Sequence, residues 1–478
     1  MCFAIIAGRD TTVSGNVMLG ANDDWPGYPG HVRYKPRARH APGAMHTLAS
    51  GAAIPQPAET AAYYTATCAY ATGTLPESWA FGINEHQVSV AMTGVYAFRF
   101  LRTGGAMEAD DLSVLVLERG RTAREAVRLI GDLIERHGLG LSCVDEAYGA
   151  VVMAIADPDE GWWLEATPGG LWAAQRVPDD MVSWRPNCFG LQELDFNDTA
   201  NIMCSPDLIA RALEQGWYGG SGPFNFAKVM GADGPTEVVY GNEDGPINSY
   251  RRWHAQRLVS GREQGLDEKQ YFGRPDRKLS ARDFMNILRD SSEGSRYDLA
   301  KAPEAGPYHN PFWKPYSTSI GQSGTVISFV FEARRELPPE IGGLMWMAFS
   351  NTHLTSFIPC YIGGEGTLED LVKGEYGQFD PNVPWWIFQE LGQVCYRNYD
   401  EAARRKVIPA MRKLEDEFLA SQRFMEDCFE RALKQDPDSG RRMMNDYNKA
   451  CAAKAISLAG GLTSFVKGHY FSNIVVEE

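Results

Sequence analysis

The chain has 478 residues and a net charge of −15, from 61 acidic and 46 basic residues. This length supports a large buried core with more than one layer or lobe. The acidic balance repels phosphate backbones and argues against a nucleic-acid partner, and the chain has no run of eighteen apolar residues that would predict a membrane span.

The predicted elements begin with a hairpin. Residues 3–7 form a short apolar strand, residues 8–16 supply turn-forming residues, and residues 17–21 form a second strand. Residues 28–60 are rich in Pro, Gly, His and Ala and predict a long loop. Further strands are predicted at 63–70, 88–97, 149–156, 161–165 and 171–177.

Helices are predicted where apolar residues recur at three- and four-residue spacing. One covers 110–138, another begins near Ser205, and a third covers 280–290. Strands return at 324–333, 343–350 and 356–362, and helical periodicity dominates 399–433 and 438–467. Because strands and helices do not alternate regularly, the pattern predicts an α+β protein with largely antiparallel sheets.

The cysteines and histidines exclude several kinds of site. The nine cysteines are widely spaced without a C-x-x-C motif, which argues against a disulfide scaffold or a structural zinc site. The nine histidines form no H-E-x-x-H motif, so we expect no metal or other cofactor. Since no secretory signal is visible either, we expect a cytoplasmic protein.

Cys2 directly precedes the first predicted strand, and this position suggests catalysis. Removal of Met1 would leave one residue with both a thiol and a free α-amine, whose ordinary pKa is about 7.7–8.0. A neutral amine can accept the thiol proton and later return it to a leaving group. The alternative is a near-terminal cysteine that has no role.

The second strand of the predicted hairpin ends in the sequence "GANDDW". If the two strands pair, Asn22, Asp23 and Asp24 lie beside Cys2, and a carboxylate there can orient its amine. The alternative for these three residues is a solvated turn. The hairpin therefore favours catalysis over both alternatives.

Several ordered segments together resemble the C69 family of N-terminal nucleophile (Ntn) dipeptidases. They are the Cys2 hairpin, "GINEHQVSVAMTG" (82–94), "ADPDEGWWLEATPGGLWAAQRVPDD" (156–180), "PNCFGLQELDFND" (186–198), "MCSPDL" (203–208), "SSEGSRYDL" (291–299) and "GGLMWMAFSNTHLTSFIPCYIGG" (342–364). The resemblance implies an Ntn-hydrolase core at 2–365, built as a four-layer αββα sandwich, with a helical C-terminal extension at 366–478 packed on it. It implies metal-free hydrolysis of dipeptides or similar small peptides through an acyl-thioester.

The resemblance and the local pattern suggest roles for five residues around the proposed nucleophile. Cys2 is the expected nucleophile, and Asp24 is the expected partner of its amine. Asn22 either contacts substrate or fixes its loop, the backbone near Thr93 is a candidate oxyanion donor, and Asn84 is either another donor or a turn cap.

Two further residues are candidates for substrate binding. Glu165 either binds a peptide ammonium or pairs with an arginine such as Arg176. Arg251, or its neighbour Arg252, either meets a substrate carboxylate or lies on a helix surface.

Departures from the family pattern leave other functions open. Ala21 stands where relatives commonly carry an arginine, and Cys188 replaces another arginine. An N-acyl or natural-product amide, as in bile-salt hydrolases and penicillin acylases, is therefore the alternative substrate. A third hypothesis is a non-catalytic relative that binds a partner through its helical tail. The acidic, aromatic-rich composition and helical tail also suggest a homo-oligomer.

Overall fold

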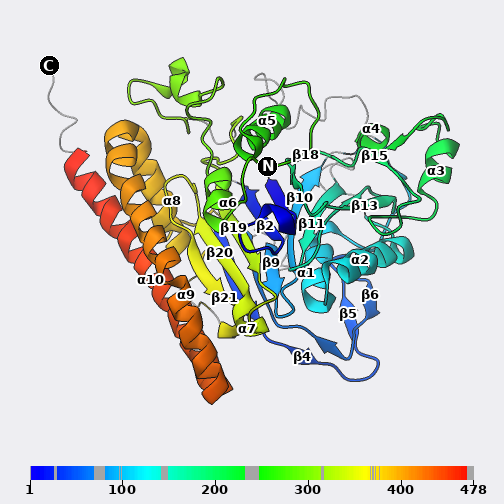
Figure 1. The fold of residues 1–478 in the computed structure, drawn as a ribbon, viewed down its shortest axis with the longest axis horizontal. Coiled ribbons are helices and arrows are strands. Elements are labelled where there is room, and N and C mark those ends of the chain that lie inside the picture. The colour runs from blue at the N-terminus through cyan, green and yellow to red at the C-terminus, as the bar shows by residue number, and fades with distance from the viewer. Residues whose placement is uncertain are drawn as a thin grey trace.

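The structure is a computed structural model. It describes residues 2–25, 29–68, 81–95, 97, 99–140, 149–231, 247–313, 317–366, 368, 371, 373–375 and 377–470. Two large antiparallel sheets lie face to face in the middle of the molecule, and helices flank them on both sides (Figure 1). The predicted α+β class with antiparallel sheets is therefore confirmed. None of the helices in these ranges is long and apolar enough to cross a lipid bilayer.

Seven strands form the sheet around the amino terminus. In spatial order they are β18 (Phe272–Gly273), β14 (Val182–Arg185), β1 (Phe3–Ala7), β2 (Met18–Asp24), β19 (Thr325–Ala333), β20 (Gly343–Phe349) and β21 (Ile358–Tyr361). The β1–β2 hairpin lies inside this sheet and pairs Phe3 with Asn22. The predicted hairpin is thus confirmed, although its second strand extends to Asp24.

Eight strands form the other sheet. In spatial order they are β16 (Ile202–Cys204), β13 (Trp172–Arg176), β12 (Gly161–Ala166), β11 (Ala150–Ala156), β10 (Ser89–Val95), β9 (Phe81–Asn84), β8 (Tyr63–Cys68) and β3 (Gly30–Lys35). Residues 69, 70 and 96, which fall in the predicted strands, lie outside the described residues. The prediction of a loop over 28–60 is wrong, because β3 pairs with β8 and short strands follow it: β4 (Ala38–Arg39), β5 (Met45–Thr47), β6 (Ala53–Pro55) and β7 (Glu59–Thr60).

The central strands of the eight-stranded sheet are buried on both faces. Val152 and Ala154 of β11 belong to the core that includes the other sheet, whereas Val151 and Met153 belong to the core under the helices. Successive side chains of a strand point to opposite faces, so each strand contributes to both cores. This double burial explains the nearly continuous apolar run of β11.

Helices cover the outer faces of both sheets. On the eight-stranded sheet lie α1 (Ala109–Arg119) and α2 (Ala123–His137), and on the seven-stranded sheet lie α6 (Ala281–Leu288) and α8 (Pro384–Cys395). The prediction of one helix over 110–138 is wrong, because the chain turns at Gly120 and Thr122 caps a second helix by accepting a hydrogen bond from the Glu125 N–H. The remaining helices of the body are α3 (Leu208–Glu214), α4 (Phe226–Gly231), α5 (Ile247–Ser260) and α7 (Pro339–Gly342). The short pair β15 (Glu193–Leu194) and β17 (Phe224–Asn225) lies near α3 and α4.

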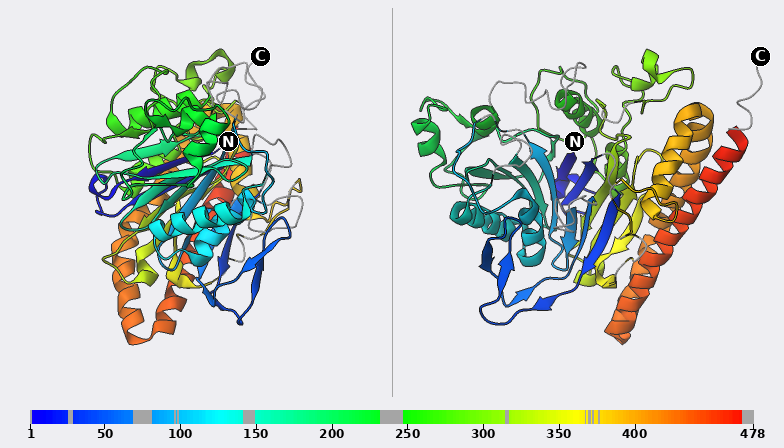
Figure 2. Two further views of the ribbon diagram at one scale, coloured as in Figure 1. Left: turned by 90° about the vertical axis from the view of Figure 1, so that its right-hand side faces the viewer. Right: turned by 180° about the vertical axis from the view of Figure 1, so that it is seen from behind.

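The C-terminal helices lie beside the edge strand β21 (Figures 1 and 2). They comprise a π-helix (Tyr399–Val407), α9 (Ile408–Gln435) and α10 (Pro437–Tyr470). Asn448 of α10 accepts a hydrogen bond from the Tyr361 N–H and donates one to the Tyr361 carbonyl, so it satisfies backbone groups of the edge strand. Glu415 of α9 is fully buried and pairs with Arg289 next to α6. The helices at 399–433 and 438–467 are thus confirmed.

Candidate active site

Three strands bring Cys2 to one end of the seven-stranded sheet. Cys2 directly precedes β1, and the β1–β2 register continues to place it opposite Asp23. On the other side β14 pairs Arg185 with Ala4, so Asn187, two residues beyond β14, lies alongside Cys2. The Cys2 N–H donates to Asn187 Oδ1 at 2.7 Å. Sequence reasoning did not choose Asn187 as a site residue, because its approach depends on a pairing across more than 180 residues.

The two consecutive aspartates of β2 face opposite sides of the sheet. Asp23 shares a face with Cys2, and its Oδ1 lies 3.7 Å from the Cys2 Sγ. Asp24 turns the other way, where its Oδ1 accepts a hydrogen bond of 2.6 Å from the Thr325 hydroxyl. Asp23 is therefore the carboxylate in contact with the sulfur. The sequence shows two consecutive aspartates at the end of the strand, but only the pleat of the strand determines which of them faces Cys2.

Burial dominates the electrostatics of these three groups. It raises the pKa of the Cys2 thiol to about 12. It raises the pKa of Asp23 to about 7, against the opposing charge of the chain's amino terminus, and the pKa of Asp24 to about 6. The thiol is thus protonated at neutral pH, so attack requires a base that takes its proton at the moment of reaction.

Arg251 of α5 holds the backbone of Cys2. Its guanidinium is fully buried and donates to the Cys2 carbonyl at 2.7 Å, to Asn187 Oδ1 at 3.0 Å and to Asn248 Oδ1 at 2.6 Å. Asn248 in turn donates to the Asn187 carbonyl at 3.0 Å. The structure thus brings Arg251 to Cys2, where its hydrogen bonds orient the residue that bears the thiol. That Arg251 also meets a substrate carboxylate stays a prediction.

Thr93 lies beside this network on β10. The next residue, Gly94, accepts a hydrogen bond of 2.8 Å at its carbonyl from Asn187 Nδ2. The Thr93 side chain is fully buried, and its hydroxyl has no hydrogen-bond partner in the described part of the chain. The structure therefore places a hydroxyl donor next to the residues that surround Cys2.

Asn22 fixes the loops next to the hairpin. It lies on the face of β2 opposite to Cys2, where it accepts a hydrogen bond from the Ser328 hydroxyl at 2.6 Å. Its amide donates to the carbonyls of Leu288 at 2.8 Å and Ile320 at 3.1 Å. Of the two roles considered for Asn22, these contacts are those of a residue that fixes its loop.

The structure does not bring Asn84 to the site. Asn84 ends β9 near the first residue of β10, whereas the site lies near the last residues of β10. Its amide donates to the carbonyls of Leu117 and Gly120, and its oxygen accepts from two backbone N–H groups of the following turn. All these contacts are those of a turn cap, the second of the two roles considered for Asn84, and none of them reaches Cys2.

Glu165 is paired with an arginine inside the layer between the sheets, which is the second of the two roles considered for it. Glu165 and Arg185 are both fully buried, with Oε1 3.0 Å from the Arg185 Nε. The same carboxylate accepts from the N–H groups of Gly190 and Leu191. An arginine partner was the alternative in the sequence, but the arginine is Arg185 of the facing sheet. Arg176 instead pairs with Asp179 and Glu160.

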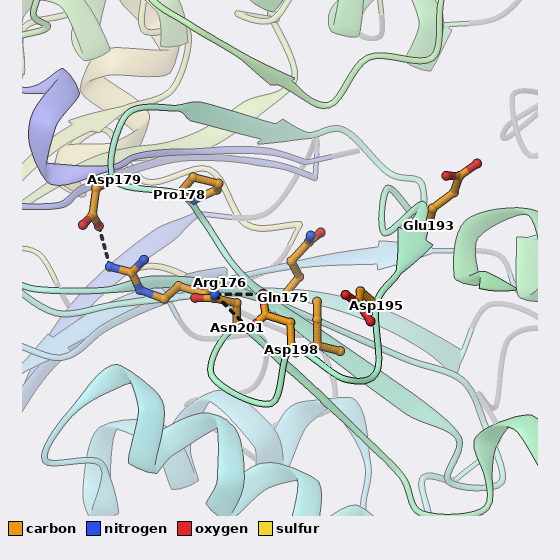
Figure 3. Close-up of a pocket in the computed structure, with 9 residues that line it drawn as sticks. Gln175, Arg176, Pro178, Asp179, Glu193, Asp195, Asp198 and Asn201 are labelled. Atoms are coloured by element: carbon orange, nitrogen blue, oxygen red, sulfur yellow. Dashed lines mark hydrogen bonds and ion pairs between the residues drawn. The ribbon is translucent and has the colours of Figure 1, made fainter. Parts of the chain in front are cut away.

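An open cavity of about 290 Å³ lies elsewhere (Figure 3). Its lining residues are Gln175, Arg176, Pro178, Asp179, Glu193, Asp195, Asp198, Asn201 and Ile202. The Asp179 carbonyl accepts a hydrogen bond from the Asp10 N–H, so this cavity lies near the end of β1 that is remote from Cys2. Within the described residues, no cluster of three or more His, Cys, Asp and Glu side chains could hold a metal ion.

Comparison with known proteins identifies relatives over most of the chain. The model of peptidase family C69 matches residues 1–410. The chain is 26% identical over 419 residues to a probable dipeptidase B of Lactococcus lactis, covering 84% of this chain and 82% of that protein. It is 28% identical over 386 residues to a probable dipeptidase of Salmonella dublin, covering 76% and 81%. It is also 24% identical over 322 residues to dipeptidase A of Lactobacillus helveticus, covering 66% and 63%.

Proposed function

The chain belongs to peptidase family C69 and is a peptidase, and we propose that it hydrolyses dipeptides and similar small peptides with Cys2 as an N-terminal nucleophile. The observation that carries this proposal is the fixed position of Cys2. Its nitrogen is bonded to Asn187, its carbonyl to Arg251, and its sulfur contacts Asp23. The dipeptidase names of the relatives support the substrate class.

In the proposed reaction, removal of Met1 converts the Cys2 nitrogen into a free amine. Asn187 Oδ1 accepts one N–H of this amine, which leaves the nitrogen lone pair to take the thiol proton. The sulfur then attacks the peptide carbonyl, the C–S bond forms, and the C–N bond breaks as the ammonium returns the proton to the leaving amine. Water hydrolyses the resulting thioester and regenerates the thiol.

The surrounding groups support the developing charges. Arg251 fixes the Cys2 carbonyl, and this restricts the directions in which the amine and thiol can point. The Thr93 hydroxyl, which has no hydrogen-bond partner in the described ranges, and the backbone next to it are our candidates for donors to the oxyanion. Asp24 remains our candidate for stabilising the ammonium that forms on Cys2, since it is fully buried at the end of the neighbouring strand.

The fold supports the same proposal. Two facing antiparallel sheets with helices on their outer faces are what the αββα sandwich of an Ntn hydrolase requires, and the proposed nucleophile lies at the start of an inner strand. We therefore assign the body of the chain to this fold, with the C-terminal helices as an extension packed on it.

Substitution of the two neighbouring thiols tests the proposed function. Cys2→Ala should reduce hydrolysis of a dipeptide panel by at least about 10³-fold, because both the nucleophile and its contacts are lost. The matched control is Cys188→Ala, which removes a buried thiol next to Asn187 and should retain most of the activity. Hydrolysis by Cys2→Ala at the rate of the unmodified enzyme would exclude the proposal.

A further inference from the structure

One oxygen of Asp23 is buried without a partner. The Asp23 side chain is 5% exposed, its Oδ1 contacts the Cys2 sulfur, and its Oδ2 has no hydrogen-bond partner among the described residues. No lysine, arginine or histidine side chain in the described part of the chain forms an ion pair with it, and the positive charge that acts on it is that of the chain's amino terminus. Burying a carboxylate with an incomplete set of hydrogen bonds costs free energy unless a ligand completes the set.

The other cations and carboxylates near the site have partners of their own. The Arg251 guanidinium donates to Cys2, Asn187 and Asn248. Asp24 accepts from Thr325 on the opposite face of the sheet. The Asp23 carboxylate is therefore available on the face of the sheet that carries the nucleophile.

The position of Asp23 matches one group of a bound peptide. In the first residue of a peptide, the N–Cα and Cα–C bonds of about 1.46 and 1.52 Å place the α-nitrogen about 2.5 Å from the carbonyl carbon. A sulfur poised to attack that carbon lies about 3–3.5 Å from it. The α-nitrogen thus lies within about 6 Å of the sulfur, and Asp23 Oδ1 is 3.7 Å from the same sulfur.

We propose that Asp23 binds the α-ammonium of the substrate's first residue, so that Cys2 cleaves the first peptide bond only of peptides with a free amino terminus. This inference rests on the proposed function and names the residue that selects the substrate. An N-acylated peptide offers a neutral amide in place of the ammonium and leaves the Asp23 charge buried without a counter-charge. The assignment therefore disfavours N-acyl amides as substrates.

A matched pair of substrates isolates the ammonium. Alanyl-alanine and propionyl-alanine have the same scissile bond and leaving group, and they differ in the α-amino group alone. The unmodified enzyme should cleave alanyl-alanine with a kcat/KM at least about 100-fold higher. Equal cleavage of the two substrates would overturn the role of Asp23, while hydrolysis that still requires Cys2 would leave the proposed function intact.

The Asp23→Asn variant tests whether Asp23 causes the preference for alanyl-alanine over propionyl-alanine. It should lose most of the preference, because the kcat/KM for alanyl-alanine falls while that for propionyl-alanine is retained. An equal loss on both substrates would contradict the proposal, since it would mean that Asp23 acts on Cys2 itself. Glu193→Gln, an acid-to-amide change in the distant cavity of Figure 3, is the matched control and should keep the full preference. Thermal unfolding checks that both variants fold.

Discussion

Asp23 and Glu165 are both buried carboxylates in the layer between the two sheets, but their surroundings differ. Glu165 has an arginine and two backbone N–H groups as partners. Asp23 has one long contact to a sulfur, and its other oxygen has no hydrogen-bond partner among the residues that the structure describes. A carboxylate whose hydrogen bonds are complete anchors the fold, whereas one left incomplete beside the proposed nucleophile is suited to a ligand. The difference separates a structural charge, Glu165, from Asp23, the charge in the same layer to which we assign a function.

The largest expected effect is the loss of stability when Glu165, the structural carboxylate, is replaced. Glu165→Ala leaves the buried Arg185 guanidinium without its counter-charge and two backbone N–H groups without their acceptor, so the free energy of unfolding should fall by about 3–5 kcal/mol. Urea denaturation measures it. The control is Glu214→Ala, which removes an exposed partner of Arg211 and should cost at most about 1 kcal/mol. Equal losses in the two variants would show that Glu165 is not an anchor.

The second prediction concerns Asp23 and the pH dependence of the free energy of unfolding. Burial raises the pKa of Asp23 to about 7 in the folded chain, so between its unfolded and folded pKa values the folded state binds more protons. Stability from this group is therefore lost as the pH rises. Asp23→Asn is always neutral and should gain about 2 kcal/mol relative to the unmodified chain between about pH 5 and pH 7. Asp24 titrates with the same sign in both proteins, so most of its contribution cancels in the difference. Urea unfolding at each pH measures the two stabilities. A constant difference between the variant and the unmodified chain across the pH series would contradict this expectation.

The smallest effect concerns the geometry around the nucleophile. Arg251→Lys keeps the charge but cannot reach three acceptors in one plane, so kcat should fall about tenfold. Arg252→Lys is the neighbouring control, because the Arg252 guanidinium donates to the Ser249 hydroxyl and to two backbone carbonyls away from Cys2. Steady-state kinetics compares the two variants. A larger loss in Arg252→Lys would refute the role given to Arg251.

Local sequence was sufficient for the part of the site that a hairpin builds. Cys2 and the Asn-Asp-Asp segment are adjacent because two short apolar strands flank a turn, and both signals lie within 25 residues. Turn chemistry and strand alternation are local properties, so they can be inferred without the fold. The missed strand β3 carried such a signal in its alternation of polar and apolar residues, but the Pro- and Gly-rich surroundings concealed it.

Long-range pairing determined the rest of the site. Asn187 reaches Cys2 because β14 pairs with β1, and Arg251 reaches it because α5 packs over β14. The sequence suggests Arg176 as an example of an arginine that pairs with Glu165, but the partner is Arg185 of the facing sheet. The sequence shows which residues are present, but the stacking of the two sheets decides which of them meet.

Trapping of the covalent intermediate tests the proposed nucleophile most directly. The enzyme is mixed with a slowly hydrolysed dipeptide, quenched in acid, digested and analysed by mass spectrometry. We expect the amino-terminal fragment to begin at Cys2 and to carry the substrate's first residue as a thioester. An acylated residue other than Cys2, or turnover by enzyme that fully retains Met1, would contradict the mechanism.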